Sequence, residues 1–367
     1  MRKTMYINLF SPPYDQISAS SRSCLAVARL AGYQGLLPKI LDGGNIQTII
    51  HNNGKICIKF HADGMPYEQK FGKERAFDTP ISEDSLTGIA IGSSLAGMRP
   101  IFVHQRMDFL MLCMNQLVNM ASKICYLSNG IQNVPIVIRA SIGRSWGQGA
   151  QHSQSLYSFF AHVPGLKVIA PTTPYDVKGG IIASINDNNP VIFVEHRMLY
   201  ENKGLVPKKK YEISLSSARV TKKGSDLTLI GVSYTVVDCL RASEILKDKK
   251  IDVEVIDLIC ISNLDIKTII KSAKKTKKII IVDNDWLYCG LASEIATQVS
   301  EKLKFKIPIE RMGYKFSPCP TTRNLEDNFY PSANVIAKKA YEMITNKKDW
   351  TPKKIINKEI LEFKGPF

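Results

Sequence analysis

Two stretches of the sequence hold residues that could transfer a proton, and the first surrounds Glu83. Glu83 lies in the word DTPISED among small and apolar residues, and Ser82 before it is a residue type that often begins a helix. A carboxylate in apolar surroundings can share a proton with a bound base. Taken alone, however, a glutamate in the first turn of a helix is more often a surface residue stabilised by the helix dipole.

The second stretch is AQHSQ, which places His152 in a polar, glycine-flanked loop after a strand-like run that begins at Val134. Histidine titrates near neutral pH and can therefore donate or accept a proton during a reaction. Without further information, a loop histidine is an ordinary surface residue.

The elements that would position these residues alternate along the chain. From about residue 84, short β-branched runs alternate with helical stretches, which predicts parallel sheets covered by helices on both faces. The first strand-like runs begin at Ile101, Val134, Leu166 and Pro190. From Phe109 to Cys125, apolar residues recur at spacings of three and four, which predicts one long buried helix. Phe109 itself could be a core residue of that helix.

A change of composition divides the chain into two predicted domains. After Tyr200, the sequence NKGLVPKKKYEIS is polar, basic and without periodicity, as a linker is. A second α/β series follows, so we predict two doubly wound α/β domains. The predicted bounds are 1–200 for the first domain with an atypical segment at 1–70, 201–215 for the linker, 216–347 for the second domain and 348–367 for a basic tail. In the atypical segment we predict only a helix over Ser20–Ala31 and a strand over Lys55–Phe60.

Composition excludes several other classes of protein. The 367 residues are 44% hydrophobic and 22% charged, which is the balance of a globular chain. Since no run of eighteen apolar residues occurs, we expect no membrane partner, and the N-terminus lacks a signal-peptide pattern, so we expect a cytoplasmic protein. The eight cysteines have no zinc-site spacing. The net charge of +16 lies largely in lysine runs without regularly interleaved aromatic residues, which favours a solvated surface over a nucleic-acid partner.

The sequence around Glu83 resembles the beta subunits of pyruvate and branched-chain 2-oxoacid dehydrogenases, which belong to the transketolase-like superfamily. The resemblance is strong over residues 71–200 and looser through YPSANVI at Tyr330. The words that carry it occur in the same order in this family: FG-x-x-R-x-x-DTPISE, GIAIG, AG-x-RP, NQ-x-VN, QGAQHSQS, FAHVPGLKVIAP, TPYDVKG and NDNNPVIFVE. The implied fold is a transketolase-type pyrimidine-binding domain followed by a transketolase C-terminal-like domain.

The resemblance assigns roles to three side chains. It implies that Glu83 hydrogen-bonds a ring nitrogen of the aminopyrimidine of thiamine diphosphate and so favours the reactive imino tautomer. It implies that Phe109 packs against the face of the pyrimidine ring. It places His152 at the mouth of the active site, where it exchanges protons with a reaction intermediate and the incoming lipoyl group.

The resemblance also implies two metal ions. A potassium ion would be held by the backbone carbonyls of Ile136, Ser184, Asp187 and Asn189, because hard oxygen ligands suit such a cation. A magnesium ion would bind the diphosphate, usually through a GDG motif and a later Asn pair. The sequence contains no GDG. We therefore expect an alpha-type subunit to hold the magnesium ion, in an α2β2 heterotetramer with the cofactor between the chains.

Three features depart from the family pattern. ICISNLD at Ile259 lacks the usual arginine, HNNG at His51 stands where an acidic word is usual, and the chain is strongly basic. The family often presents an acidic surface to a basic docking domain of a dihydrolipoyl acyltransferase. The positive charge of this chain would repel such a domain, so this partner stays an open alternative.

We therefore predict decarboxylation of a small, pyruvate-like 2-oxoacid on thiamine diphosphate with acyl transfer to lipoamide. The alternatives are transfer of a two-carbon unit onto an activated sugar by the same chemistry, a non-catalytic scaffold subunit, and nucleic-acid binding through the basic surface. The intact DTPISE and AQHSQ words oppose the scaffold alternative.

Overall fold

The structure is a computed structural model that describes residues 79, 81–144, 147–200 and 202–353, together with the backbone of strands at 5–8, 45–52 and 55–61. Residue contacts divide the chain into two compact units. The first holds the described residues up to Ile142 and Phe159–Leu215, and the second holds Gly143–Ser158 and the described residues from Ser216 to 353. The helix predicted at Ser20–Ala31 lies outside the described residues.

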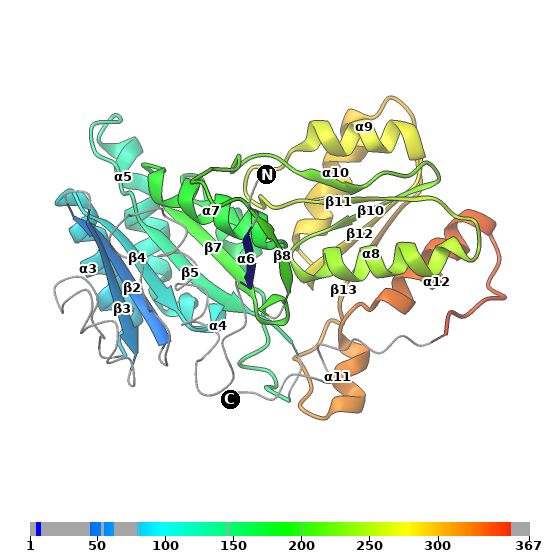
Figure 1. The fold of residues 1–367 in the computed structure, drawn as a ribbon, viewed down its shortest axis with the longest axis horizontal. Helices are drawn as coiled ribbons and strands as arrows, with labels where there is room; N and C mark the ends of the chain where they lie inside the picture. Colours follow the sequence, from blue (N-terminus) through cyan, green and yellow to red (C-terminus); the bar gives the residue numbers. More distant parts are fainter. Residues whose placement is uncertain are drawn as a thin grey trace. The chain divides into compact units, whose positions relative to one another are not determined.

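The first unit is built on a six-stranded sheet with the order β3-β2-β4-β5-β7-β6 (Figure 1). The last four of these strands run parallel, and β2 and β3 add an antiparallel edge. A separate antiparallel pair joins β1 to β8. The strands are β1 (Met5–Asn8), β2 (Asn45–Asn52), β3 (Lys55–His61), β4 (Arg99–His104), β5 (Val137–Ile142), β6 (Lys167–Ile169), β7 (Val191–His196) and β8 (Lys203–Val206). The strand predicted at Lys55–Phe60 is confirmed by β3.

Helices accompany this sheet along the chain, and α3 contacts both β4 and the helical segment that follows it. The helices are α3 (Glu83–Leu95), α4 (Met107–Leu110), η1 (Met111–Cys113), η2 (Asn115–Ala121), α5 (Ser122–Leu127), α6 (Tyr157–Ala161), α7 (Pro174–Asn186) and η3 (Arg197–Leu199). Threonine 173 begins α7 because its side chain accepts a hydrogen bond from the backbone N–H of Asp176.

The segment predicted as one long buried helix from Phe109 to Cys125 is helical but not uniform. It passes from α4 through the 3-10 turn η1 and the π-helix η2 into α5. Leu110, Cys113 and Leu117 are fully buried, whereas Phe109 is 38% exposed. The alternative that Phe109 is a core residue is therefore wrong. Apolar residue type could not show this, because large apolar side chains also occur at exposed positions.

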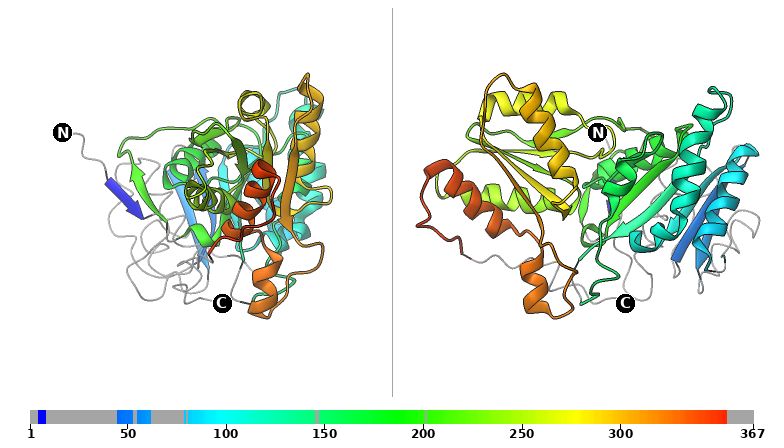
Figure 2. Two further views of the ribbon diagram at one scale, coloured as in Figure 1. Left: turned by 90° about the vertical axis from the view of Figure 1, so that its right-hand side faces the viewer. Right: turned by 180° about the vertical axis from the view of Figure 1, so that it is seen from behind.

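The second unit is a five-stranded sheet with the order β13-β12-β10-β11-β9, in which only β9 runs antiparallel to its neighbour. Figure 1 shows α9 and α10 on one side of this sheet and α8 and α12 on the other, and Figure 2 shows the same layers from behind. The elements are β9 (Arg219–Lys222), β10 (Leu227–Gly231), α8 (Tyr234–Lys247), β11 (Val253–Asp257), α9 (Ile266–Thr276), β12 (Ile279–Trp286), α10 (Leu291–Lys302), β13 (Ile309–Tyr314), α11 (Arg323–Phe329) and α12 (Ala333–Thr345).

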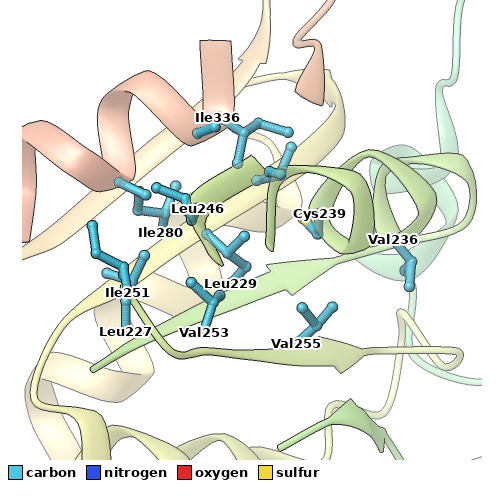
Figure 3. Packing of buried hydrophobic residues seen from close by; sticks show 14 residues of the cluster. Leu227, Leu229, Val236, Cys239, Leu246, Ile251, Val253, Val255, Ile280 and Ile336 are labelled. Carbon is cyan, nitrogen blue, oxygen red and sulfur yellow. The ribbon is translucent and has the colours of Figure 1, made fainter. Parts of the chain in front are cut away.

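The core of this second unit follows directly from residue periodicity. Leu227 and Leu229 of β10 lie two residues apart, as do Val253 and Val255 of β11, so each pair points to the same face of the sheet. Figure 3 shows these side chains packed beneath Cys239 and other residues of α8.

The predicted fold class, two α/β domains with parallel sheets, is confirmed. Among the residues that the structure describes, no helix is long and apolar enough to cross a membrane.

Candidate active site

Glu83 lies at the rim of a cavity in the first unit. Ser82 is the N-cap residue of α3, as predicted, although its side chain makes no capping hydrogen bond, and Glu83 is the first residue of the helix. The Glu83 side chain is half-buried. The cavity has a volume of about 430 Å³, which is within the range of small-molecule sites. Its lining residues are Thr79, Ile81, Ser82, Glu83, Leu86, Phe102, Val103, His104, Gln105, Arg106, Phe109 and Leu112.

The wall beside Glu83 is apolar and includes an aromatic ring. Leu86 comes from α3, Phe102 from β4 and Phe109 from α4, so three consecutive elements contribute to it. The exposed fraction of Phe109 thus faces a cavity that also contains the carboxylate of Glu83. An aromatic face, aliphatic side chains and one carboxylate are suited to hold a flat heterocycle that carries a basic ring nitrogen.

A buried thiol, that of Cys113, lies close enough to Glu83 to be affected by its charge. Cys113 is fully buried, and its Sγ donates a hydrogen bond to the carbonyl of Leu110 at 3.1 Å. Burial raises the pKa of Cys113 to about 11, a hydrogen bond with Thr87 opposes this rise, and the charges of Asp84 and Glu83 add to it. The thiol therefore remains neutral at physiological pH and makes no second charge next to Glu83.

His104 is a cavity residue that sequence reasoning did not identify as part of the site. It ends β4, is buried, and packs edge-on against Phe102 with ring centroids 4.5 Å apart. Its Nε2 lies 4.0 Å from Sγ of Cys113. Burial lowers the pKa of His104 to about 3, so the ring stays neutral. The available signal was its position after IFV, because residues at the carboxyl end of a parallel strand commonly line sites.

His152 belongs to the second unit, because the segment Gly143–Ser158 groups with the C-terminal sheet. Its side chain is half-buried in a loop that turns at Gly147 and Gly149, both of which have a positive φ. The structure therefore describes Glu83 and His152 in separate units, each with its own surroundings.

The four residues expected to offer carbonyls to potassium come from two places in the first unit, the start of β5 and the connection from α7 to β7. They are Ile136 before β5, Ser184 in α7, and Asp187 and Asn189 in the turn that leads to β7. The guanidinium of Arg99 donates to the carbonyl of Asp187 at 2.8 Å and to that of Ile185 at 2.8 Å. The carbonyl of Ile136 accepts from the backbone N–H of Val191 at 3.0 Å. Part of this acceptor set is thus already paired with a fixed cation, and the geometry gives potassium no separate support.

The described residues contain no metal-binding cluster, and the departure from the family pattern near Ile259 has an unusual backbone. Within the described part of the chain, no group of three or more His, Cys, Asp or Glu side chains is placed to hold a metal ion. Ile259, where the resembling family usually has an arginine nearby, is buried with a φ of 55°. A β-branched side chain is strained in this left-handed region, so the departure is accompanied by an unusual backbone. The side chains of HNNG at His51 lie outside the described residues.

Comparisons with known proteins agree with the two-domain α/β fold. Residues 59–203 match the model of the transketolase pyrimidine-binding domain, and residues 216–336 match that of the transketolase C-terminal domain. The chain is 39% identical over 266 residues to the acetoin:2,6-dichlorophenolindophenol oxidoreductase subunit beta of Cupriavidus necator, which covers 72% of this chain and 79% of that protein.

Two other relatives have a similar level of identity. The pyruvate dehydrogenase E1 component subunit beta of Porphyra purpurea is 39% identical over 259 residues, covering 70% of this chain and 78% of that protein. The 2-oxoisovalerate dehydrogenase subunit beta of Bacillus subtilis is 40% identical over 256 residues, covering 69% and 78%. A solved structure described as a split gene transketolase, inactive beta4 tetramer, is 20% identical with a TM-score of 0.61, covering 76% of this chain and 88% of that one. At this identity it supports the fold alone.

Proposed function

Because the chain belongs to the family of beta subunits of thiamine-diphosphate-dependent 2-oxoacid dehydrogenases, we propose that it activates this cofactor for the decarboxylation of a small 2-oxoacid. The acyl group that results would be transferred to lipoamide. The relatives are oxidoreductase subunits, so an enzyme subunit is favoured over a scaffold or a nucleic-acid-binding protein.

The observation that carries this proposal is the carboxylate of Glu83 in a cavity with an apolar and aromatic wall. A ring nitrogen of an aminopyrimidine is a weak base, and a carboxylate beside it can hold the shared proton. Glutamate suits this task because its side chain reaches farther than that of aspartate. When bound, thiamine diphosphate supplies the electron sink that decarboxylation requires.

The resemblance also assigns roles to Phe109, which would position the cofactor ring, and to His152, which would transfer protons. Phe109 would pack against the flat face of the ring and limit its tilt. His152 would donate or accept a proton at an imidazole nitrogen as the acyl group moves to its acceptor. Support for these two roles comes from the exposure of Phe109 to the cavity and from the loop position of His152.

We further propose that an alpha-type subunit completes the site. The names of the relatives denote beta subunits, which implies an alpha partner, and we expect an α2β2 heterotetramer in which that partner holds the magnesium ion and the diphosphate. A dihydrolipoyl acyltransferase remains a proposed third partner. A potassium ion on the carbonyls of Ile136, Ser184, Asp187 and Asn189 stays a prediction from the resemblance. The cytoplasm is the compartment we propose, although one relative is described as mitochondrial.

Acetoin is a second candidate substrate. Two relatives at 39% and 38% identity are named acetoin:2,6-dichlorophenolindophenol oxidoreductase subunit beta. The relatives do not favour the alternative in which a two-carbon unit is transferred to an activated sugar. Substrate choice is therefore tested among pyruvate, branched-chain 2-oxoacids and acetoin.

The proposed function can be tested on the two co-purified subunits. The measurements are release of carbon dioxide from labelled pyruvate and branched-chain 2-oxoacids, and dye reduction with acetoin, each with and without thiamine diphosphate. Glu83→Gln should lower turnover by a factor of about 100 or more while the complex still assembles, because the amide cannot share the proton. Asp84→Asn is the matched control, since Asp84 is the exposed neighbour in the same helical turn. Normal turnover by the Glu83→Gln complex would show that the role assigned to Glu83 is wrong.

A further inference from the structure

The segment that carries His152 is anchored in the second unit on its C-terminal side by Tyr157. Tyr157 is fully buried, and its hydroxyl donates to Oδ1 of Asp283 at 2.5 Å. The hydroxyl oxygen of Tyr157 also accepts a hydrogen bond from the backbone N–H of Asn284 at 3.1 Å. The other carboxylate oxygen of Asp283 accepts from the backbone N–H of Ala292 at 2.8 Å. Tyr157 is thus bonded to two residues of β12, and the start of α10 in turn bonds to Asp283.

Ser155 and Ser158 extend this anchor on either side of Tyr157. The hydroxyl of Ser155 lies 2.9 Å from the hydroxyl of Tyr314 in β13, and both groups are buried. Ser158 donates to Oδ2 of Asp285 at 3.2 Å. Three residues within four positions of the chain therefore bond to the ends of two neighbouring strands.

Arg144 provides a second anchor on the N-terminal side of His152. Its guanidinium donates to Oδ2 of Asp238 at 3.0 Å and to the carbonyl of Pro331 at 2.9 Å. It also lies over the rings of Tyr234 and Tyr330, at 4.7 Å and 5.2 Å from their centroids. A charge-assisted pair, a carbonyl and two aromatic faces fix the arginine, which is itself buried.

The loop between the two anchors packs closely against Thr321 at Gly147 and Gly149. Gly147 and Gly149 have φ values of 67° and 69°. A Cβ added at Gly147 would lie 3.0 Å from the carbonyl oxygen of Thr321, and one added at Gly149 would lie 3.0 Å from its hydroxyl. The backbone on the N-terminal side of His152 is therefore pressed closely onto the second unit.

We propose that these two anchors are a positioning device for His152, in which Tyr157 with Asp283 and Arg144 with Asp238 hold the loop in its reactive geometry. The inference deepens the proposed function and rests on it for the role of His152. None of the four anchoring residues is a catalytic residue, since each acts through the loop. A catalytic loop needs such support because a displacement of about 1 Å can cost about 100-fold in rate.

A first experiment measures the loop without using activity. Hydrogen exchange followed by mass spectrometry compares the full chain, in complex with its alpha-type partner, with the variant Tyr157→Phe. The amides of residues 147–156 should exchange about tenfold faster, because a buried hydrogen bond to a carboxylate is lost, while β10 and β11 should exchange as before. The matched control is Tyr200→Phe, which removes another buried tyrosine–carboxylate bond, to Glu195 at 3.3 Å in the first unit.

Exchange in residues 147–156 that is unchanged, or that rises equally throughout the second unit, would overturn the proposal. Should Tyr157→Phe fail to fold, Ser155→Ala removes the bond to Tyr314 and carries the same expectation. Because exchange does not depend on turnover, a failure of this proposal and a failure of the proposed function give different results.

A second experiment couples the anchor to His152 in turnover. Tyr157→Phe should lower kcat several-fold with little change in KM, and it should have no further effect in a chain that already carries His152→Ala. A purely structural role would instead lower kcat by the same factor in both backgrounds, which would contradict positioning through His152. If the wild-type complex shows no thiamine-diphosphate-dependent turnover at all, the proposed function is wrong. The exchange experiment would still test whether Tyr157 anchors residues 147–156.

Discussion

The two regions that hold the assigned proton-transfer residues are built in different ways. Glu83 is placed by the first turn of its own helix, and its cavity is completed by residues within about thirty positions of the chain. The loop of His152 is held by partners far along the chain: Tyr157 bonds to a residue 126 positions later, and Arg144 to residues 94 and 187 positions later. The first geometry is local and the second depends on the folded second unit. We expect substitutions in the two regions to differ accordingly.

The largest expected difference concerns removal of a charged partner. Asp238→Ala should lower the free energy of unfolding by about 3–5 kcal/mol, because it leaves the guanidinium of Arg144 buried without its carboxylate. Asp84→Ala, next to Glu83 on an exposed turn, should change it by no more than about 0.5 kcal/mol. Urea denaturation measures both values. Equal losses of stability at Asp238 and Asp84 would contradict the expected difference between the two regions.

A second difference should appear in the dependence of stability on pH. Burial raises the pKa of Asp285 to about 7, and the charge of Asp283 adds to this rise. Since the folded state holds this proton more tightly than the unfolded state, the stabilising contribution is complete below a pH of about 4 and is lost as the pH rises through 7. Asp285→Asn removes this titration. Relative to the wild type, the variant should therefore gain a few kcal/mol of stability between pH 5 and pH 8.

This pH effect is checked by denaturation at several pH values. The two carboxylates titrate as a pair, so the midpoint belongs to both Asp283 and Asp285. A difference in stability between variant and wild type that stays constant from pH 5 to pH 8 would contradict the expectation.

Two glycine substitutions should have opposite signs in the two regions. Gly147→Ala in the His152 loop should cost about 1–2 kcal/mol, because φ is 67° and the new Cβ would lie 3.0 Å from a backbone oxygen. Gly92→Ala in α3 should instead stabilise the chain by about 0.5–1 kcal/mol, because this position is helical, exposed and open around the new Cβ. Thermal unfolding measures both shifts, and the same sign at both sites would argue against the difference.

The smallest expected effect concerns Phe109. Phe109→Leu should weaken binding of thiamine diphosphate to the assembled complex by a factor of about three to ten, because the aromatic face is lost, while stability changes little. Tyr126→Leu is the control, since Tyr126 is an exposed aromatic residue of the same helical segment that does not line the cavity. Calorimetric titration distinguishes the two, and equal affinities for both variants would argue against a cofactor contact by Phe109.

Much of the fold could be predicted from sequence because its signals are local. Runs such as IFVH at Ile101 and PVIFVE at Pro190 indicated buried parallel strands, and both form as expected in β4 and β7. The edge strands β9 and β13 and the helix α10 were not predicted, since β9 and β13 are only partly buried and lack a continuous apolar run. The π-helix η2 was missed because its residues have the same apolar spacing as an α-helix.

The candidate site divides in the same way. The word DTPISE indicated Glu83 at the start of a helix, because capping and charge preferences depend on a few adjacent residues. His104 and the acidic residues of VDND at Asp283 were not identified as important. Their surroundings depend on residues that approach them only in the folded chain, such as Tyr157 beside Asp283, and sequence spacing does not show such contacts.

The sequence by itself determined the fold class, the family and the position of Glu83 at the start of a helix, since periodicity and short words are properties of neighbouring residues. Only the tertiary structure decided that Gly143–Ser158 packs with the second unit, and that a buried tyrosine and a buried arginine hold the His152 loop there. The physical reason is that these bonds join groups about a hundred residues apart, which approach one another only when the sheet and its helices have packed.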